Sequence, residues 1–549
     1  MQAIFSRLSS GWFALCCIAA ILGGTQAHAN DAAIPQFIRE RLAGSPPIAI
    51  AATPNERAVL AELYRSNSFN ALWHQDGRLT QPAVTVLAEL KLAENYGLRP
   101  DTYTQDLIHS ADEMLLDPAA AAAVDITISA AAARFINHLH YGRIDPREAG
   151  FQLSAPRPAL NLSTAVLNLA AAADIRATLE SYEPQAIYYR LLKRQLALYR
   201  DLAARANLTL LPLLPARSIT LDDEYAGAAA LRELLVSVGD LDAAQVVHEP
   251  AATVLDAALI AAIQRFQRRH GLDPDGLLGK RTFAALTTPF RQRVRQIELT
   301  MERWRWLPPL RPPLIIINIP QFMLFAFPAS PPPSPVLEIP VIVGRDTLRL
   351  RTPVLTSSIT SVVFRPYWDV PGSITQRELL PLIQRNPRYL EEHHMQIVRV
   401  TSGGTEIFEP TAENLAALAA GTLRLRQQPG PDNALGPIKF VLPNSYDVYL
   451  HATPEAHLFE AARRAFSHGC IRVSDPITLA EYVLRYAPGE WNAATIEAGM
   501  CGSKTFTVQL TTPLPVMLLY GTAVATETHG MLFFEDIYGY DGKLEALLP

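Results

Sequence analysis

The sequence contains little cysteine. Only four cysteines occur among 549 residues, and two of them, Cys16 and Cys17, lie in an apolar run near the N-terminus. The rest of the chain keeps Cys470 and Cys501. Disulfide-stabilised scaffolds need many more cysteines, so this chain is not one of them. Either the two cysteines pair, or at least one is kept for its chemistry. They form no C-x-x-C pair, so a thiol-disulfide exchange enzyme is a weak alternative.

Charge of one sign is also scarce. Charged residues make up 18% of the chain and the net charge is -5. A nucleic-acid-binding protein usually shows a strong basic excess, so we predict no nucleic-acid partner. Hydrophobic residues make up 49%, which is typical of a globular protein and not of a disordered one. The chain is too long for one hydrophobic core and predicts roughly two to four domains.

Long apolar runs are missing beyond the N-terminus. Arg7 precedes the apolar run GWFALCCIAAILGG (11–24), and Ala27-His28-Ala29 supplies small residues around a cleavage point. The run is shorter than the about 20 residues that a membrane-spanning helix needs. We therefore expect residues 1–29 to be a signal peptide and the protein to be exported to the periplasm. The alternative is an uncleaved N-terminal anchor, which would be the protein's only contact with a membrane.

Residue patterns divide the rest of the chain into a helical part and a β-rich part. Residues 30–248 show helical spacing of apolar residues, for example at 58–65 and 83–98, and 118–134 is alanine-rich. Residues 313–327 predict two strands separated near Pro320. We therefore expect a multidomain α+β protein whose C-terminal part, 311–549, is β-rich with a few helices.

A small helical module and a connecting helix lie between these parts. In residues 249–290, Asp256 can cap a helix, Asp273-Pro274-Asp275-Gly276 predicts a turn, and a second helical piece runs from Thr282 to Leu286. Residues 291–307 then predict one further helix, which ends at two prolines.

The stretch 444–476 places histidines close to one of the remaining cysteines. YDVYLH (446–451) predicts a strand that ends at His451. Cys470 follows Ser467-His468-Gly469, and Asp475 and Pro476 predict the cap and first residue of a helix. The cysteine would therefore lie on a short segment backed by a helix, and a nucleophile needs such rigid support.

Cysteine beside histidine suits nucleophilic catalysis. The attacking species is the thiolate, and a nearby imidazole can take the thiol proton and keep an ion pair. Gly469 would leave space beside the sulfur, and N–H groups near Gly469 and Cys470 could hold an oxyanion. On residue types alone, a buried structural cysteine is equally well supported. The spacing of His451, His457, His468 and Cys470 fits no usual zinc pattern, so we predict no metal.

Several segments resemble one enzyme family. His451 together with SHGCIRV (467–473) resembles the signature of the YkuD-type L,D-transpeptidase catalytic domain. QRFQRRHGLDPDGLLGKRTFAAL (264–286) resembles a peptidoglycan-binding module. The large YcbB-type L,D-transpeptidases are matched over most of the chain, in the segments YGLRPDTY (96–103), LHYGRIDP (139–146), MERWRWLP (301–308), FRPYWDVPGSI (364–374), GPDNALGPIKF (430–440), YLHATP (449–454), PVMLLYGTA (515–523) and FFEDIYGYD (533–541).

The resemblance implies a domain order. Residues 30–248 would form a helical scaffold domain and 249–290 a three-helix peptidoglycan-binding module. A connecting helix, 291–310, would lead to the catalytic domain, 311–549. Tyr367 and Trp368 would begin an insertion, at about 366–430, that resembles the substrate-covering lid of the family.

The resemblance also implies roles for single residues. Cys470 would be the nucleophile, His451 the base that activates it, and the backbone carbonyl of Ala452 the group that orients the imidazole. His468 is a competing base, which we interpret as shaping the site. The remaining candidates for binding substrate or shaping the site are Ser467, Arg472, Tyr367, Trp368, Asn433, Gly436 and Lys439.

The implied reaction is acyl transfer between peptidoglycan stem peptides. Cys470 would form a thioester with release of D-alanine, and the amine of a second stem would resolve it into a 3-3 cross-link. No metal or organic cofactor is implied, and cell-wall synthases are conceivable further partners. The residues leave three alternatives open: an L,D-carboxypeptidase, an enzyme that attaches proteins to the wall, and a non-catalytic wall-binding scaffold.

Overall fold

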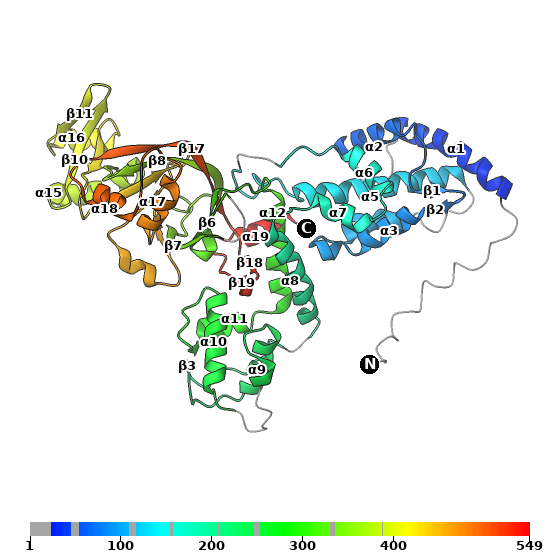
Figure 1. Cartoon of the computed structure of the whole chain (residues 1–549), viewed down its shortest axis with the longest axis horizontal. Coiled ribbons are helices and arrows are strands. Elements are labelled where there is room, and N and C mark those ends of the chain that lie inside the picture. Colours follow the sequence, from blue (N-terminus) through cyan, green and yellow to red (C-terminus); the bar gives the residue numbers. More distant parts are fainter. Residues whose placement is uncertain are drawn as a thin grey trace. The chain divides into compact units, whose positions relative to one another are not determined.

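The computed structural model describes residues 24–44, 54–108, 117–153, 157–205, 208–245, 253–329, 335–386 and 388–548. The expected signal peptide, residues 1–29, therefore lies mostly outside the described residues. The chain divides into two compact units, Met1–Tyr141 with Pro158–Glu183 and Gly142–Arg157 with Pro184–Pro549. Figure 1 shows the helical first unit in blue to cyan and the mixed second unit in green to red.

The first unit is a helical bundle around α5 (Pro118–Tyr141). By length and composition α5 could span a membrane, contrary to the expectation that no segment beyond the N-terminus would. However, 78% of its apolar window is buried inside the unit, so α5 is a core helix rich in alanine. The other elements of this unit are α1 (Gly24–Ala43), α2 (Pro54–Ser66), β1 (His74–Gln75), β2 (Arg78–Leu79), α3 (Gln81–Lys91), η1 (Ala93–Tyr96), α4 (Asp101–Ile108), α6 (Leu162–Ala170) and α7 (Ile175–Tyr182).

The helical pattern at 83–98 is not one continuous helix. α3 ends at Lys91, and the 3₁₀ turn η1 follows after Leu92. Gly97 takes the left-handed conformation at φ 68°, and the Leu98 N–H donates to the carbonyl of Ala93. The helical spacing thus continues through a tighter final turn, whose hydrogen bonds satisfy the carbonyl groups at its end.

The second unit also contains a group of helices. α8 (Ile187–Ala203) lies along α12 (Phe290–Arg305), so the described residues between 184 and 245 pack in this unit and not with the first bundle. α10 (Ala257–Arg269) is capped by the Asp256 carboxylate, which accepts from the Leu259 N–H at 2.8 Å. The other elements of this region are β3 (Ser218–Ile219), α9 (Ala228–Ser237), η2 (Ala243–Gln245), β4 (Leu278–Gly279) and α11 (Lys280–Leu286).

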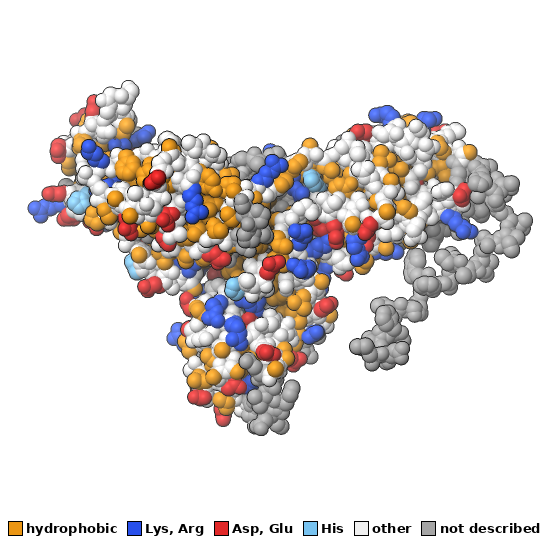
Figure 2. Space-filling model, viewed as in Figure 1, with side chains coloured by type: hydrophobic (Ala, Val, Ile, Leu, Met, Phe, Trp, Pro, Cys, Tyr) orange, Lys and Arg blue, Asp and Glu red, His pale blue; other side chains and the backbone are white. Residues whose placement is uncertain are grey.

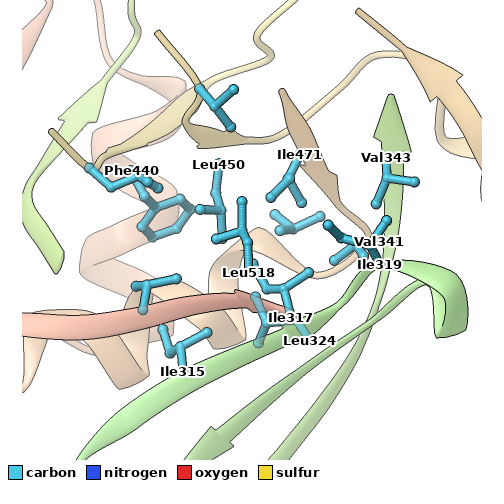
Figure 3. Close-up of a cluster of buried hydrophobic side chains, with 14 of the residues drawn as sticks. Ile315, Ile317, Ile319, Leu324, Val341, Val343, Phe440, Leu450, Ile471 and Leu518 are labelled. Atoms are coloured by element: carbon cyan, nitrogen blue, oxygen red, sulfur yellow. The ribbon is translucent and has the colours of Figure 1, made fainter. Parts of the chain in front are cut away.

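A nine-stranded sheet forms the centre of the second unit. Its order is β15-β7-β16-β14-β13-β8-β17-β5-β6, and β6 also pairs with β7, so the sheet closes around its core. Figure 3 shows Phe440, Leu450, Ile471, Val343 and Leu518 directed into this core. The strands are β5 (Leu314–Asn318), β6 (Met323–Phe327), β7 (Leu337–Gly344), β8 (Leu355–Phe364), β13 (Ile438–Val441), β14 (Leu450–His451), β15 (Ala465–Ser467), β16 (Ile471–Val473) and β17 (Phe506–Leu519).

Short elements complete this sheet domain. Pro320 lies in the 3₁₀ turn η3 (Ile319–Gln321) between β5 and β6, as expected from the sequence. α17 begins with Asp475 as its cap and Pro476 at its first position, also as expected. The remaining elements are η5 (Ala456–Glu460), α17 (Pro476–Leu484), α18 (Ala493–Cys501), β18 (Ala523–Thr526), β19 (Gly530–Phe533) and α19 (Tyr540–Leu547). With a helical bundle, a small helical module and a β-rich domain in one chain, the multidomain α+β fold class is confirmed.

The insertion between β8 and β13 has a core of its own. Its four strands have the order β11-β10-β12-β9, and its apolar cluster includes Ile383, Ile397 and Leu425. Its elements are β9 (Trp368–Asp369), α13 (Gly372–Ile374), the π-helical turn η4 (Thr375–Leu379), α14 (Leu380–Arg385), α15 (Tyr389–Glu392), β10 (Met395–Thr401), β11 (Gly404–Phe408), α16 (Ala412–Ala419) and β12 (Arg424–Gln427).

The strand expected at 446–451 is much shorter than its pattern suggested. Only Leu450 and His451 pair as β14. Asp447 takes a positive φ of 54°, and Asn444 Oδ1 accepts from the N–H groups of Tyr446 and Val448. Asparagine favours such local hydrogen bonds over the hydrogen bonds between strands.

Over the face shown in Figure 2, basic and acidic side chains are interspersed along the described surface.

Candidate active site

Three neighbouring strands carry the candidate residues on one face of the sheet. Lys439 on β13 pairs with His451 on β14, and His451 pairs with Arg472 on β16. Successive side chains of a strand point to opposite faces. The preceding residues on β14 and β16, Leu450 and Ile471, point into the core. Lys439, His451 and Arg472 therefore form a row on the other face of the sheet.

Cys470 precedes β16 at the end of a tightly bonded loop. Gly469 has φ +116°, a region that glycine favours, and its N–H donates to Ser467 Oγ at 3.1 Å. Ser467 Oγ donates in turn to the Cys470 carbonyl, and Thr352 Oγ1 donates to the Gly469 carbonyl at 2.8 Å. The Gly469 amide is therefore already engaged, contrary to its expected role as an oxyanion donor. The Cys470 amide donates none of the hydrogen bonds found among the described residues.

His451 is held in one orientation by its own backbone neighbour. The side chain is 4% exposed, and Nδ1 lies 2.6 Å from the carbonyl oxygen of Ala452. Since a carbonyl oxygen can only accept, Nδ1 carries the hydrogen and Nε2 keeps its lone pair. Gly436, with φ +61°, lies against this segment, and a Cβ there would approach Ala452 Cβ to 2.8 Å. The site therefore presents a base whose proton-accepting atom is Nε2.

Burial keeps both reacting groups neutral at rest. Burial first, and then the charges of Arg472 and Lys439, lower the pKa of His451 to about 3. Burial also raises the pKa of the Cys470 thiol, against hydrogen bonds from Tyr449 and the positive charge of Lys439. The thiol sulfur lies 3.7 Å from the Asp447 carbonyl. Both shifts favour a neutral thiol and a neutral imidazole over the ion pair that the residue types suggested.

His468 contacts the insertion. Its Nε2 lies 2.9 Å from a carboxylate oxygen of Glu378 in the π-helical turn η4.

Among the described residues no group of three His, Cys, Asp or Glu side chains is arranged to hold a metal ion. His457 is exposed in η5, and Cys501 is exposed at the end of α18.

Asn433 secures the base of the insertion and does not line a pocket. Its Nδ2 donates to the carbonyls of Pro366 and Gln428, and its Oδ1 accepts from the Leu435 N–H. The side chain is 1% exposed, and both its polar atoms are occupied by backbone groups. This corrects its expected place in the pocket wall, because its hydrogen bonds join the two ends of the insertion.

Tyr367 and Trp368 stand where the insertion begins. Tyr367 is exposed beneath the Arg426 guanidinium, whose carbon lies 5.0 Å from the ring centre. Trp368 lies in β9 opposite Gln427, and its side chain is close enough to Tyr449 to affect the pKa of that phenol. The start of the insertion therefore lies near the tyrosine whose ring meets that of His451.

Sequence reasoning missed several residues that complete the site. Tyr449 lies two positions before His451, and strand alternation could have placed both on one face. Their rings meet edge to face with centroids 5.7 Å apart. Thr352 and Glu378 come from distant segments, and no local pattern marks them or the nearby Glu455. Arg472 pairs with Glu455 through Nη1, while its Nε is buried without a hydrogen-bond partner.

A large cavity in the second unit does not identify the site. It measures about 920 Å³ and is lined by residues such as Tyr188, Trp304 and Phe325, but by neither Cys470 nor His451. Large pockets are often functional sites. The candidate site lies elsewhere, where the half-buried Cys470 precedes β16 and the oriented, buried His451 stands on the neighbouring strand β14.

Comparison with known proteins identifies three domains in this chain. Family models match residues 58–196 ("Scaffold domain"), 226–286 ("Putative peptidoglycan binding domain") and 312–511 ("L,D-transpeptidase catalytic domain"). A Haemophilus influenzae protein described as "Putative L,D-transpeptidase" is 33% identical over 231 residues, covering 42% of this chain. The chain spans 45% of that relative's length.

A solved structure gives a weaker comparison. The crystal structure of the L,D-transpeptidase (residues 123–326) from Xylanimonas cellulosilytica matches 56% of this chain and 100% of its own, at 14% identity and a TM-score of 0.17. A likeness at that score carries no argument. The three domain matches and their order are the stronger finding, and they give this chain the domain arrangement seen in YcbB-type L,D-transpeptidases.

Proposed function

We propose that this protein is a peptidoglycan L,D-transpeptidase that forms 3-3 cross-links through a thioester on Cys470. The observation that carries the proposal is the orientation of His451, whose Nδ1 is held by the Ala452 carbonyl on the strand next to Cys470. This arrangement leaves Nε2 as a proton acceptor on the face of the sheet that carries the thiol. A nucleophile with an oriented base is the minimum that acyl transfer by cysteine needs.

In the first step the thiol proton moves to Nε2 of His451 and the sulfur attacks the carbonyl of the donor's L,D-peptide bond. The free amide of Cys470 is the available donor for the oxyanion. When the tetrahedral intermediate collapses, the C–N bond breaks and His451 returns its proton to the departing D-alanine amine. A thioester remains on Cys470.

In the second step the amine of another stem peptide gives a proton to His451 and attacks the thioester. The C–S bond breaks, the thiol is restored, and the new amide is the cross-link. With water in place of the amine, the same site would act as an L,D-carboxypeptidase. The acceptor therefore decides between the two activities.

Recognition of the wall and export complete the proposal. The peptidoglycan-binding domain supports contact with peptidoglycan, and it packs in the same unit as the catalytic domain. Such a substrate lies outside the cytoplasm, so we propose export through the N-terminal segment. Cell-wall synthases as partners remain a hypothesis based on the family resemblance alone.

Product analysis tests the proposed function. The purified protein is incubated with disaccharide-tetrapeptides beside the Cys470→Ala and Cys501→Ala variants, and the products are identified by mass spectrometry. We expect dimers that have lost one D-alanine with the wild type and Cys501→Ala, and none with Cys470→Ala. Tripeptide monomers alone would establish the carboxypeptidase instead. Equal activity of Cys470→Ala would refute the assignment of the nucleophile.

A further inference from the structure

Lys439 is a half-buried cation without an ion-pair partner in the candidate site. Its ammonium lies 3.7 Å from the centre of the Tyr449 ring. No carboxylate among the described residues comes within salt-bridge distance of it, whereas Arg472 in the same row is paired with Glu455. Burying a charge without a partner is unfavourable. An unpaired ammonium beside a nucleophile therefore calls for a functional explanation.

The surrounding charges do not neutralise Lys439. Asp369 and Asp447 are its nearest acidic neighbours, and both act only at longer range. Asp369 is already paired with Arg426 at 2.6 Å, and Asp447 is exposed. The Cys470 sulfur is the other group whose charge the ammonium affects. Since that thiol is neutral at rest, the site carries an excess positive charge close to the sulfur.

We propose that Lys439 binds the C-terminal carboxylate of the acyl donor. This carboxylate belongs to the D-amino acid that leaves when Cys470 attacks. This assignment rests on the proposed function, because it names the group of that substrate which the site recognises. A carboxylate would supply the partner that the ammonium lacks, and a charge-assisted hydrogen bond between them would be strong.

Covalent geometry places that carboxylate within reach. One residue separates the scissile carbonyl from the terminal carboxylate, so the two carbons lie about 3 to 4 Å apart. When the carbonyl is at the sulfur, the carboxylate is next to Tyr449, which lies close enough to Cys470 to affect the pKa of its thiol and carries the Lys439 ammonium over its ring. A longer donor would place a neutral amide there, and its carboxylate would lie one residue further away. Lys439 would therefore select donors that end directly after the cleaved bond.

The test compares two donors on four forms of the full chain. One donor is the disaccharide-tetrapeptide with a free carboxylate, and the other is the same molecule ending in D-alaninamide. The forms are the wild type, Lys439→Met, Lys439→Arg and Lys504→Met, in which an exposed lysine is removed as a control. kcat/KM for release of the leaving group is measured with each donor, and the Cys470 thioester is followed by mass spectrometry.

We expect the wild type and Lys504→Met to prefer the free carboxylate by about 10- to 100-fold. Lys439→Met should reduce this preference to about twofold or less, and Lys439→Arg should retain most of it. If Lys439→Met does not fold, Lys439→Gln is the second neutral variant. A preference unchanged in the neutral variant overturns the proposal.

Two other results are distinguishable from that one. If Lys439→Met slows both donors equally and shifts the pH profile of thiol alkylation, the lysine acts on the sulfur and not on the carboxylate, and the proposal is overturned. If the wild type forms no thioester with either donor, the proposed function itself fails, and the carboxylate assignment fails with it.

Discussion

The low pKa of His451 predicts acylation that tolerates mild acid. The base works only while its Nε2 is unprotonated. With a pKa of about 3, His451 is protonated to only about 1% at pH 5, whereas a histidine at the ordinary value of about 6.5 would be about 97% protonated. Between pH 7 and pH 5 we therefore expect kcat/KM for thioester formation to change by less than about 1.5-fold. An ordinary histidine would lose about 25-fold over the same interval.

Single-turnover acylation measures this directly. The disaccharide-tetrapeptide is mixed with excess protein at pH 5, 6 and 7, and the Cys470 thioester is quantified by mass spectrometry, with circular dichroism confirming the fold at each pH. Arg472→Met is the informative variant, because removing a neighbouring positive charge should raise the pKa of His451 and make its rate fall more steeply. A wild-type rate that falls tenfold or more, with an inflection near pH 6.5, would refute the reasoning.

Three further predictions concern the same site. Gly436→Ala should lower the free energy of unfolding by about 1 to 3 kcal/mol and slow acylation, because the new Cβ would clash with Ala452. The control is Gly421→Ala, which has a φ of +77° but no close neighbour, so chemical denaturation should show only the cost of the left-handed backbone conformation. His451→Ala should reduce kcat/KM by about 10³-fold or more and His468→Ala by less than about tenfold; the reverse order would make His468 the base. Because the folded pKa of His451 lies below its unfolded value, the unfolded chain binds more protons between about pH 3 and 6.5, and stability is lost as the pH falls through that window. His451→Gln should therefore lose about 2 kcal/mol less than the wild type between pH 7 and pH 5 in denaturant titrations, and equal losses would contradict the assigned pKa.

Features that depend on neighbouring residues were predictable from the sequence. Asp475 followed by Pro476 indicated the start of α17, and Pro320 indicated the break between β5 and β6. Each rests on local geometry, since a capping carboxylate or a missing N–H acts within one turn of the chain. The domain order and the candidate pair Cys470 and His451 came from short segments that resemble a family. Family models match the same three kinds of domain in the same order, at residues 58–196, 226–286 and 312–511.

Periodicity predicted the wrong extent of a strand or helix where hydrogen bonds within the segment favoured another backbone conformation. YDVYLH alternates like a strand, yet Asn444 bonds the backbone of the turn, so only its last two residues pair. The stretch 83–98 keeps a helical period, yet the chain tightens after Lys91. In both places one side chain or one terminal turn outweighed a pattern of several residues.

The sequence by itself determined which groups this protein has for chemistry: one cysteine and one histidine in a recognisable setting, backed by a capped helix. Tertiary structure decided how they are arranged. The register of β13, β14 and β16 sets Lys439, His451 and Arg472 in one row, and a shift of one residue would have turned each into the core. That register, and the contact of Glu378 with His468, join segments far apart in the chain. The physical reason is that strand pairing and burial depend on the whole fold, and burial is what keeps the thiol and the imidazole neutral until substrate arrives.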